Sequence, residues 1–248
     1  IILFFLSFTY IELIDKTTYL NHYYFISVLS FLMIFLPANA TFSIDNLRRK
    51  KSFNQIPNWT IDSIKLLLGI VYFYAGISKI NSDWLFSAMP LKIWLPSKYD
   101  LPIIGNNLMQ QDWFHYAMSW SGMFYDLFIP FLLLNKRTRT FAFVLVVFFH
   151  VFTRILFPIG MFPYIMIVAT LIFFDARVHE KIIATMKCLL KPFRRNISTP
   201  KAQDIYPFSR RKILLPIIAI FFVFQILFPF RYLRYENELF WTEEGYRL

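Results

Sequence analysis

Residues 66–79 read LLLGIVYFYAGISK, a strongly apolar run that closes on a single charged side chain, Lys79. A run of this composition is typical of a membrane span, where an amine is costly unless it reaches water or takes part in chemistry. Two histidines, His22 and His150, also fall within apolar segments. The function therefore depends on whether the spans bring these three side chains together.

The composition excludes a soluble globular domain. The 248 residues are 57% hydrophobic and 21% aromatic but only 17% charged, and the mean hydropathy is +0.49. One globular core cannot hide this much apolar surface, so lipid must solvate a large part of it. The sequence predicts an all-α integral membrane protein built as a polytopic helical bundle.

Apolar windows predict about seven transmembrane helices. A full span needs about 20 residues at a rise of 1.5 Å each, so the sixth window is short and is expected to be tilted or buried. The predicted spans are residues 1–14, 22–40, 62–80, 114–134, 140–158, 162–174 and 213–230.

The segments between these spans alternate in charge. Residues 41–60, 135–140 and 175–212 hold most of the 26 Lys and Arg residues, and the intervening loops hold few. The positive-inside rule then places the three basic segments in the cytoplasm. Membrane topology explains the formal charge of +11, so the charge does not indicate nucleic-acid binding. Membrane lipids are a predicted partner of the protein, and nucleic acid is not.

Two regions are predicted to lie on the outer side of the membrane. Residues 81–113 are rich in Trp and Pro, which favours short interfacial or re-entrant pieces at the outer face. Residues 231–248 are predicted to begin an extracytoplasmic, β-rich region that is cut off, after a membrane domain over residues 1–230. The chain opens directly in a span without an initiator Met, so we expect it to be a fragment.

This topology puts ionisable groups of three spans in the outer half of the membrane. Asn21 and His22 lie at the outer end of the second span and Lys79 at the outer end of the third. His150 lies about 12 Å inside the outer boundary of the fifth. Each has a simpler explanation: Lys79 could extend to the interface, His22 could cap a helix, and His150 could make a structural hydrogen bond between helices.

The remaining polar groups suggest no further site. Asp126 and Arg154 could pair with each other or with backbone groups, the usual fate of buried charge. Cys188 is the only cysteine and is expected to be incidental. Since no His or Cys spacing indicates a metal site, the sequence predicts none.

A lysine in an apolar enclosure favours base chemistry. Desolvation disfavours the charged form of an amine, and a neutral amine is a competent general base. Histidines nearby can donate hydrogen bonds or carry protons. Such a site in the outer leaflet suits a lipid-soluble substrate that enters from the bilayer.

Three stretches carry a resemblance to the vitamin K-dependent γ-glutamyl carboxylase family, whose membrane part is called the horizontally transferred transmembrane domain. They occur in the family's order and cover most of residues 13–175. They are LIDKTTYLNHYY at 13–24 with PAN at 37–39 and FSID at 42–45, IVYFYAGISKINSDW at 70–84, and FFH at 148–150 with LFPIGMFPY at 156–164.

The resemblance implies an enzyme that oxygenates reduced vitamin K, with O2 and CO2 as co-substrates, and carboxylates the γ-carbon of a glutamate in a peptide or protein. The lysine of the family's Ala-Gly-x-x-Lys motif, the base that deprotonates the hydroquinone, falls on Lys79. The Asn-His pair near the reacting centre falls on Asn21 and His22. His150 and Tyr74 are the expected cofactor-binding residues, and no metal is implied.

Two departures from close relatives of the animal enzyme stand beside this match. Ala40 replaces a histidine that follows Ala-Asn, and Ser78 replaces one lysine of a Lys-Lys pair. The rival hypothesis is a non-catalytic membrane protein that binds a quinone or lipid, or assists transport, on the same scaffold. Paired inverted repeats would favour a transporter, and the sequence has none.

Overall fold

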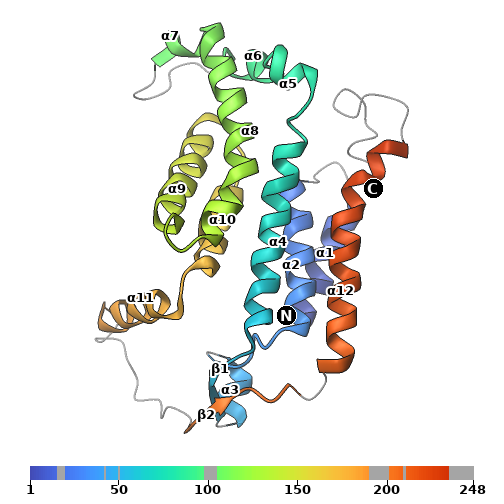
Figure 1. The fold of residues 1–248 in the computed structure, drawn as a ribbon, viewed down its shortest axis with the longest axis vertical. Helices are drawn as coiled ribbons and strands as arrows, with labels where there is room; N and C mark the ends of the chain where they lie inside the picture. Colours follow the sequence, from blue (N-terminus) through green and yellow to red (C-terminus); the bar gives the residue numbers. More distant parts are fainter. Residues whose placement is uncertain are drawn as a thin grey trace.

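The computed structural model describes residues 1–15, 20–41, 43–49, 51–97, 105–189, 201–208 and 211–234. Apolar helices make up most of it and run side by side along the long axis of the molecule (Figure 1). They are α1 (Ile2–Ile14), α2 (Asn21–Phe35), α4 (Asn58–Ile77), α8 (Asp112–Leu134), α9 (Arg139–Leu156), α10 (Phe162–Thr170) continued by the 3-10 helix η2 (Leu171–Phe173), and α12 (Arg211–Leu227).

Four of the described helices are long and apolar enough to cross a membrane: Asn58–Ile77, Asp112–Leu134, Arg139–Leu156 and Arg211–Arg231. The other three apolar helices stand at the predicted places but are shorter, at 10–17 residues. The predicted count of seven spans is therefore not confirmed. The molecule is an integral membrane protein with at least these four candidate spans.

Short elements close the two ends of the bundle. The helices α5 (Ser82–Phe86), α6 (Leu91–Trp94) and α7 (Gly105–Met109) lie at one end, within the predicted interfacial region. The opposite end, called here the strand end, holds α3 (Ile44–Arg49) and the parallel strands β1 (Lys51–Gln55) and β2 (Lys201–Ile205). The described chain is otherwise helical, as predicted, and these two short strands are the exception.

Two further helices complete the described structure. The helix α11 (Ala176–Leu189) leaves the bundle near the strand end, and the 3-10 helix η4 (Phe228–Arg234) follows α12 at the other end. The predicted β-rich region overlaps η4 in its first residues, and its part from 235 to 248 lies outside the described residues.

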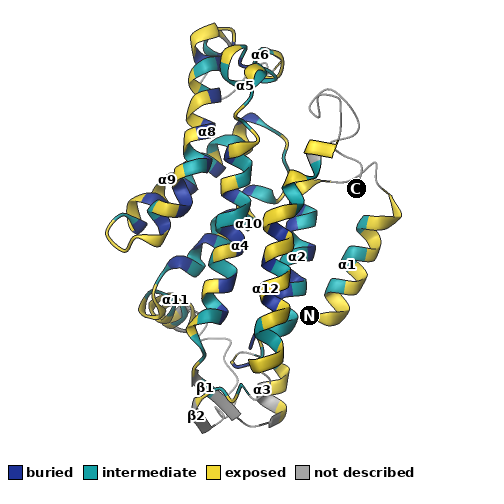
Figure 2. Ribbon diagram, turned by 45° about the vertical axis from the view of Figure 1, so that its right-hand side comes forward, coloured by how far each residue is buried: buried dark blue, intermediate teal, exposed yellow. Residues whose placement is uncertain are grey.

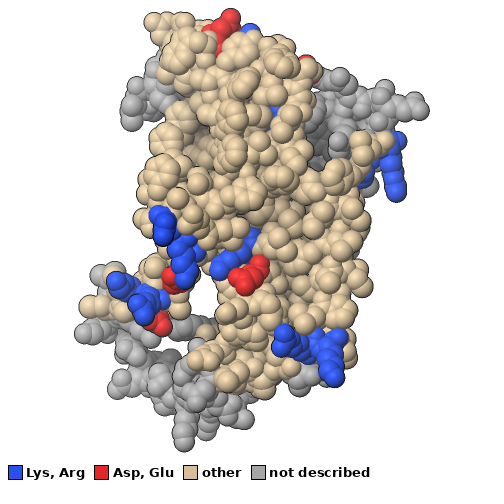
Figure 3. Space-filling view, in the orientation of Figure 1, with Lys and Arg blue, Asp and Glu red and all other residues tan. Residues whose placement is uncertain are grey.

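The outward faces of the helices are apolar, as a lipid solvent requires. Leu3 on α1, Phe148 on α9 and Ile220 on α12 are 82%, 65% and 69% exposed, and Figure 2 shows such exposed faces along the length of these helices. Lys and Arg side chains gather in the half of the molecule toward the strand end in the view of Figure 3. Between these side chains and the opposite end of the molecule, a broad band of that surface is almost free of charge.

The pair α4 and α8 forms the most extensive helix packing among the described elements. Its centre is a core that includes Leu68 and Leu133, both fully buried, with Val146 of α9 packed into the same cluster. Because this pair is tightly packed, polar side chains that lie between its helices are held in fixed positions. Both Lys79 and Asp126 belong to this interface.

Candidate active site

Lys79 lies just after the C-terminal end of α4 and pairs with a carboxylate of α8. Its Nζ lies 2.6 Å from Oδ2 of Asp126 and donates a second hydrogen bond to the carbonyl oxygen of Ala75 at 2.9 Å. The two charged side chains are only 20% and 9% exposed. Asp126 is therefore the partner of Lys79, and not of Arg154, and Lys79 does not simply extend into water.

Gly76 allows this pair to form. A Cβ at position 76 would lie 2.7 Å from side-chain atoms of Leu127 and 2.9 Å from its backbone nitrogen. Distances this short mean that α4 and α8 approach each other backbone to backbone at the residue next to Asp126. The Ala-Gly-x-x-Lys sequence thus has a structural reason: the glycine brings α8 within reach of the lysine three residues later.

Replacing Gly76 with alanine should separate the two helices and lower the stability. We expect a loss of about 2 kcal/mol, within the range for overpacking, or about 5 °C in the melting temperature, measured by thermal unfolding in detergent. Gly69→Ala is the matched control on the same helix, because its nearest neighbour would be Cβ of Pro130 at 3.9 Å. Equal melting temperatures for the two variants would contradict the close approach.

Trp84 of α5 covers the Lys79–Asp126 pair. The Nζ of Lys79 lies 5.5 Å from the centroid of the Trp84 ring, a distance at which a cation is attracted to an aromatic face. Trp84 Nε1 donates to the carbonyl oxygen of Ser119, and its backbone N–H donates to Oδ1 of Asn81. The side chain of Trp84 thus holds α5 against α8, next to the Lys79–Asp126 pair.

His150 belongs to a second buried cluster, between α9 and α4. Its Nε2 lies 3.1 Å from the hydroxyl of Tyr72, and each of these two residues is 2% exposed. Its Nδ1 is buried without a hydrogen-bond partner among the described residues. The simpler explanation for His150 was a structural hydrogen bond between helices. Its Nε2 makes such a bond, to Tyr72, and its Nδ1 has no hydrogen-bond partner among the described residues.

His22 joins the same cluster through an aromatic ring. The ring centroid of Phe162, the first residue of α10, lies 5.5 Å from that of His22 and 5.8 Å from that of His150. Phe162 thus lies against both imidazoles. His22 is buried and does not cap its helix, since Leu20 occupies the N-cap position. Asn21, the first residue of α2, is exposed.

Tyr74 points away from this cluster. Its hydroxyl donates to the carbonyl oxygen of Ile226 at 2.6 Å, and its ring lies against Phe230. Tyr72 takes the place beside His150 because residues two apart on a helix face nearly opposite directions. The predicted role of Tyr74 in cofactor binding stays a prediction, and the structure adds Tyr72 as the tyrosine of this cluster.

Aromatic side chains connect the Lys79–Asp126 pair to the histidine cluster, defined as His22, Tyr72, His150 and Phe162. Tyr125, the neighbour of Asp126 in sequence, stacks on Phe149 at 3.8 Å and lies edge-on to Tyr72 at 6.1 Å and to His150 at 6.3 Å. Tyr72 also precedes Lys79 by two helical turns, about 10 Å along α4. The ion pair and the histidine cluster therefore adjoin each other through α4 and α8, which supply Tyr72 and Tyr125 beside His150.

The sequence indicated the roles of Asp126 and Tyr72 only in part, and it did not indicate that of Phe162. Asp126 stood out as an ionisable group at mid-depth, but its partner could not be identified. Tyr72 lies seven residues before Lys79, which places both on the same face of a helix. Nothing in the local sequence indicated that Phe162 would lie between two histidines, since that contact depends on how α10 packs.

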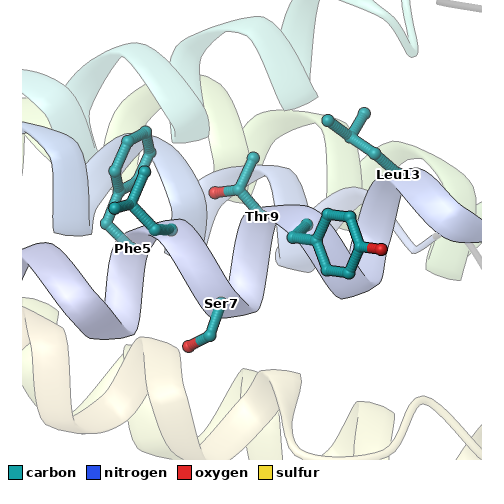
Figure 4. A pocket seen from close by; sticks show the side chains of 6 residues that line it. Phe5, Ser7, Thr9 and Leu13 are labelled. Atoms are coloured by element: carbon teal, nitrogen blue, oxygen red, sulfur yellow. The ribbon is translucent and has the colours of Figure 1, made fainter.

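Two hollows lie elsewhere on the molecule. One, of about 570 Å³, runs along α1 and is lined by residues that include Phe5, Thr9 and Leu13 (Figure 4). The other, of about 940 Å³, lies at the strand end, and Asn39 and Tyr206 are among its lining residues. Neither hollow includes the Lys79–Asp126 pair or the histidine cluster, so the apolar pocket predicted for the base is not one of these two.

Among the described residues, no group of three or more His, Cys, Asp or Glu side chains is placed to hold a metal ion. The polar chemistry of the site rests on one ammonium–carboxylate pair and on imidazole and phenol groups in aromatic surroundings. Such an arrangement can move protons at an apolar substrate while excluding water.

Comparison with protein families gives two matches. Residues 1–177 match the HTTM domain, and residues 210–248 match the lumenal domain of vitamin K-dependent gamma-carboxylase. No solved structure matches the chain. The first match spans α1 to η2 and so contains all the side chains of the site described above.

Proposed function

Because the chain belongs to the HTTM-domain family of vitamin K-dependent gamma-carboxylases, we propose that it is a carboxylase-like membrane enzyme. It couples the oxidation of reduced vitamin K to the addition of CO2 at the γ-carbon of a peptide glutamate. The largely shielded pair of Lys79 with Asp126 is the observation that carries this proposal. The pair puts a proton-transfer group at the family's lysine position, next to an aromatic, water-poor interface.

The chemistry of the residues around His150 suits an aromatic quinol. Their rings offer flat apolar faces, and the Nδ1 of His150 is a buried polar atom without a partner among the described residues. A hydroxyl or carbonyl group of a ring compound would satisfy that nitrogen. When bound, the hydroquinone supplies the reducing ring whose oxygenation drives the carboxylation.

Lys79 acts as the base in this proposal, and Asp126 makes that possible. An ammonium group must release one proton before it can take another. Transfer of that proton to Asp126 leaves a neutral amine beside a neutral carboxylic acid, and an enclosure of low polarity favours neutral forms over separated charges. Asp126 also holds Nζ in place through the 2.6 Å contact.

Asn21 and His22 are proposed to act at the carboxylation step. Within the histidine cluster, His22 is connected to His150 through Phe162, which lies against both imidazoles. Asn21 stands one residue earlier at the exposed start of α2, where a peptide glutamate can approach. This arrangement supports a division in which Lys79 acts on the quinol and the Asn-His pair acts on the peptide.

We place the site on the outer or lumenal side of the membrane. Arg139, Arg177 and Arg211 lie toward the strand end, opposite to Lys79, and Figure 3 shows more basic side chains in that half. Basic residues favour the cytoplasmic side. The quinol would then enter from the lipid, and the peptide from the aqueous phase outside.

The assay that tests this function uses the full-length protein in membranes with vitamin K hydroquinone, O2, labelled CO2 and a glutamate-containing peptide. We expect both the epoxide and an incorporated label, and both should disappear when the hydroquinone is omitted. Saturable quinol binding without either product would instead support a non-catalytic quinone-binding protein.

A pair of tyrosine variants tests where the quinol binds. Tyr72→Phe removes the hydroxyl that lies 3.1 Å from Nε2 of His150. Because His150 then loses the hydrogen bond that positions its ring toward the quinol, the KM for hydroquinone should rise about fivefold, the effect of one hydrogen bond. Tyr74→Phe tests the sequence prediction in the same assay. Tyr116→Phe is the matched control, since its hydroxyl donates to the carbonyl of Phe86. A larger effect at Tyr74 than at Tyr72 would place the cofactor near α12.

A further inference from the structure

The helix α11 is amphipathic and stands apart from the bundle. Val178, Ile182 and Met186 recur every four residues and so form a ridge along one side of the helix. Ile182 is 40% exposed and Met186 is 54% exposed. Arg177 and Lys181 are exposed as well, and their positions at 100° per residue place them off this ridge. Glu180 falls on the side opposite to the ridge.

No other element among the described residues packs extensively against α11. Figures 1 and 2 both show the helix projecting from the foot of α10 and η2, across the direction of the long helices. Its apolar ridge therefore has no cover within the part of the chain that the structure describes. A soluble helix in this position would leave apolar side chains in water.

Arg139 fixes the depth at which α11 begins. Its Nε donates to the carbonyl oxygen of Leu133 at 3.0 Å and Nη2 donates to that of Leu134 at 3.3 Å, while Nη1 lies 3.4 Å from Oδ1 of Asp175. One guanidinium group thus joins the end of α8, the start of α9 and the residue before α11. Two candidate spans end or begin at this level, so α11 starts at the boundary of the hydrocarbon layer.

The positive charge of residues 175–212 favours anionic lipid as the partner of α11. Residues 175–212 contain ten Lys and Arg residues against only Asp175, Glu180 and Asp204. A basic amphipathic helix at the membrane boundary binds best to anionic lipid, because the apolar side enters the acyl layer while the cations meet phosphate groups.

We propose that α11 is a lipid-docking helix that lies in the headgroup layer of an anionic leaflet. Its ridge of Val178, Ile182 and Met186 enters the acyl boundary, and Arg177 and Lys181 bind lipid phosphates. This inference is independent of the enzymatic proposal, because it uses no residue of the Lys79–Asp126 pair or of the histidine cluster. It assigns α11 the role of fixing the strand end of the bundle against one leaflet.

Site-directed spin labelling tests the position of the ridge. In a Cys188→Ser background, single labels are placed at Met186→Cys on the ridge and at Glu180→Cys on the opposite side, in the full-length protein. Nanodiscs of phosphatidylcholine with phosphatidylglycerol serve as the membrane. We expect the label at 186 to be accessible to O2 and shielded from a water-soluble nickel chelate, and the label at 180 to show the reverse.

The lipid dependence tests the basic residues. Replacing phosphatidylglycerol by pure phosphatidylcholine should shift the label at 186 toward nickel accessibility. The double variant Arg177→Gln and Lys181→Gln should lose this dependence, and Lys65→Gln, a partly exposed lysine on α4, should keep it. A label at 186 that is open to nickel in both membranes, or shielded from both reagents, would overturn the proposal, since the ridge would then lie in water or against protein.

Discussion

Replacing Lys79 with alanine should reduce vitamin K epoxide formation by about a thousandfold, within the range that a positioned base contributes. The variant removes the only amine in contact with Asp126 among the described residues, so the bound quinol loses its proton acceptor. Quinol binding should persist, because the aromatic walls around His150 stay intact. The measurement is epoxide formed per mole of folded protein in membranes of matched expression.

Lys65→Ala is the matched control for this variant. Lys65 lies on the same helix α4, and its Nζ is 3.4 Å from Oδ1 of Asp62, an exposed partner. The control loses a lysine and an ion pair but leaves the site intact, so its epoxide formation should stay within about twofold of wild type, as expected for a surface pair of small energetic effect. Comparable epoxide formation in Lys79→Ala and Lys65→Ala would exclude Lys79 as the base.

Replacing Asp126 with asparagine should impair both activity and stability. The ammonium group of Lys79 would keep its charge without a carboxylate, and breaking a buried pair in this way costs about 3 kcal/mol, or about 8 °C in the melting temperature. Epoxide formation should fall as well, because Lys79 can no longer pass its proton to a carboxylate. Asp62→Asn serves as the control, since Asp62 is 64% exposed.

The double variant Lys79→Ala with Asp126→Asn separates the two effects. With neither charge present, most of the lost stability should return, so the two substitutions should be strongly non-additive in melting temperature. Activity should remain absent in the double variant because the base is gone. If the loss in the double variant equalled the sum of the two single losses, the two side chains would not be coupled, which would contradict the proposed proton transfer between them.

The sequence predicted the helical membrane class because its long continuous apolar runs, separated by charged segments, are typical of membrane helices. The helices α4, α8 and α9 begin and end near the predicted limits, since charged or proline-containing segments bound their apolar runs. The span count could not be confirmed because α1, α2 and α10 are apolar enough but short. The strands β1 and β2 were missed because their pairing joins segments that are distant in sequence and polar in composition.

The candidate site was predicted in part. The sequence placed Lys79, His22 and His150 in one half of the membrane. In the structure Lys79 pairs with Asp126 of α8, and the two imidazoles lie against Phe162 in a separate cluster. The sequence could not reveal that Asp126 holds Lys79, because pairing between helices depends on the crossing at Gly76. The choice between Tyr72 and Tyr74 likewise needed the rotation of α4, which an apolar run on all sides leaves undefined.

The parallel pairing of β1 with β2 has a consequence for biogenesis. Lys51 emerges from the ribosome long before its ladder partner Lys201, and α4, α8, α9 and α10 are synthesised in between. A contact between segments so far apart forms late, since the intervening chain must be brought together first. The strand end of the bundle can therefore form only after the central helices have been synthesised. The pairing of β1 with β2 is thus a late step of assembly.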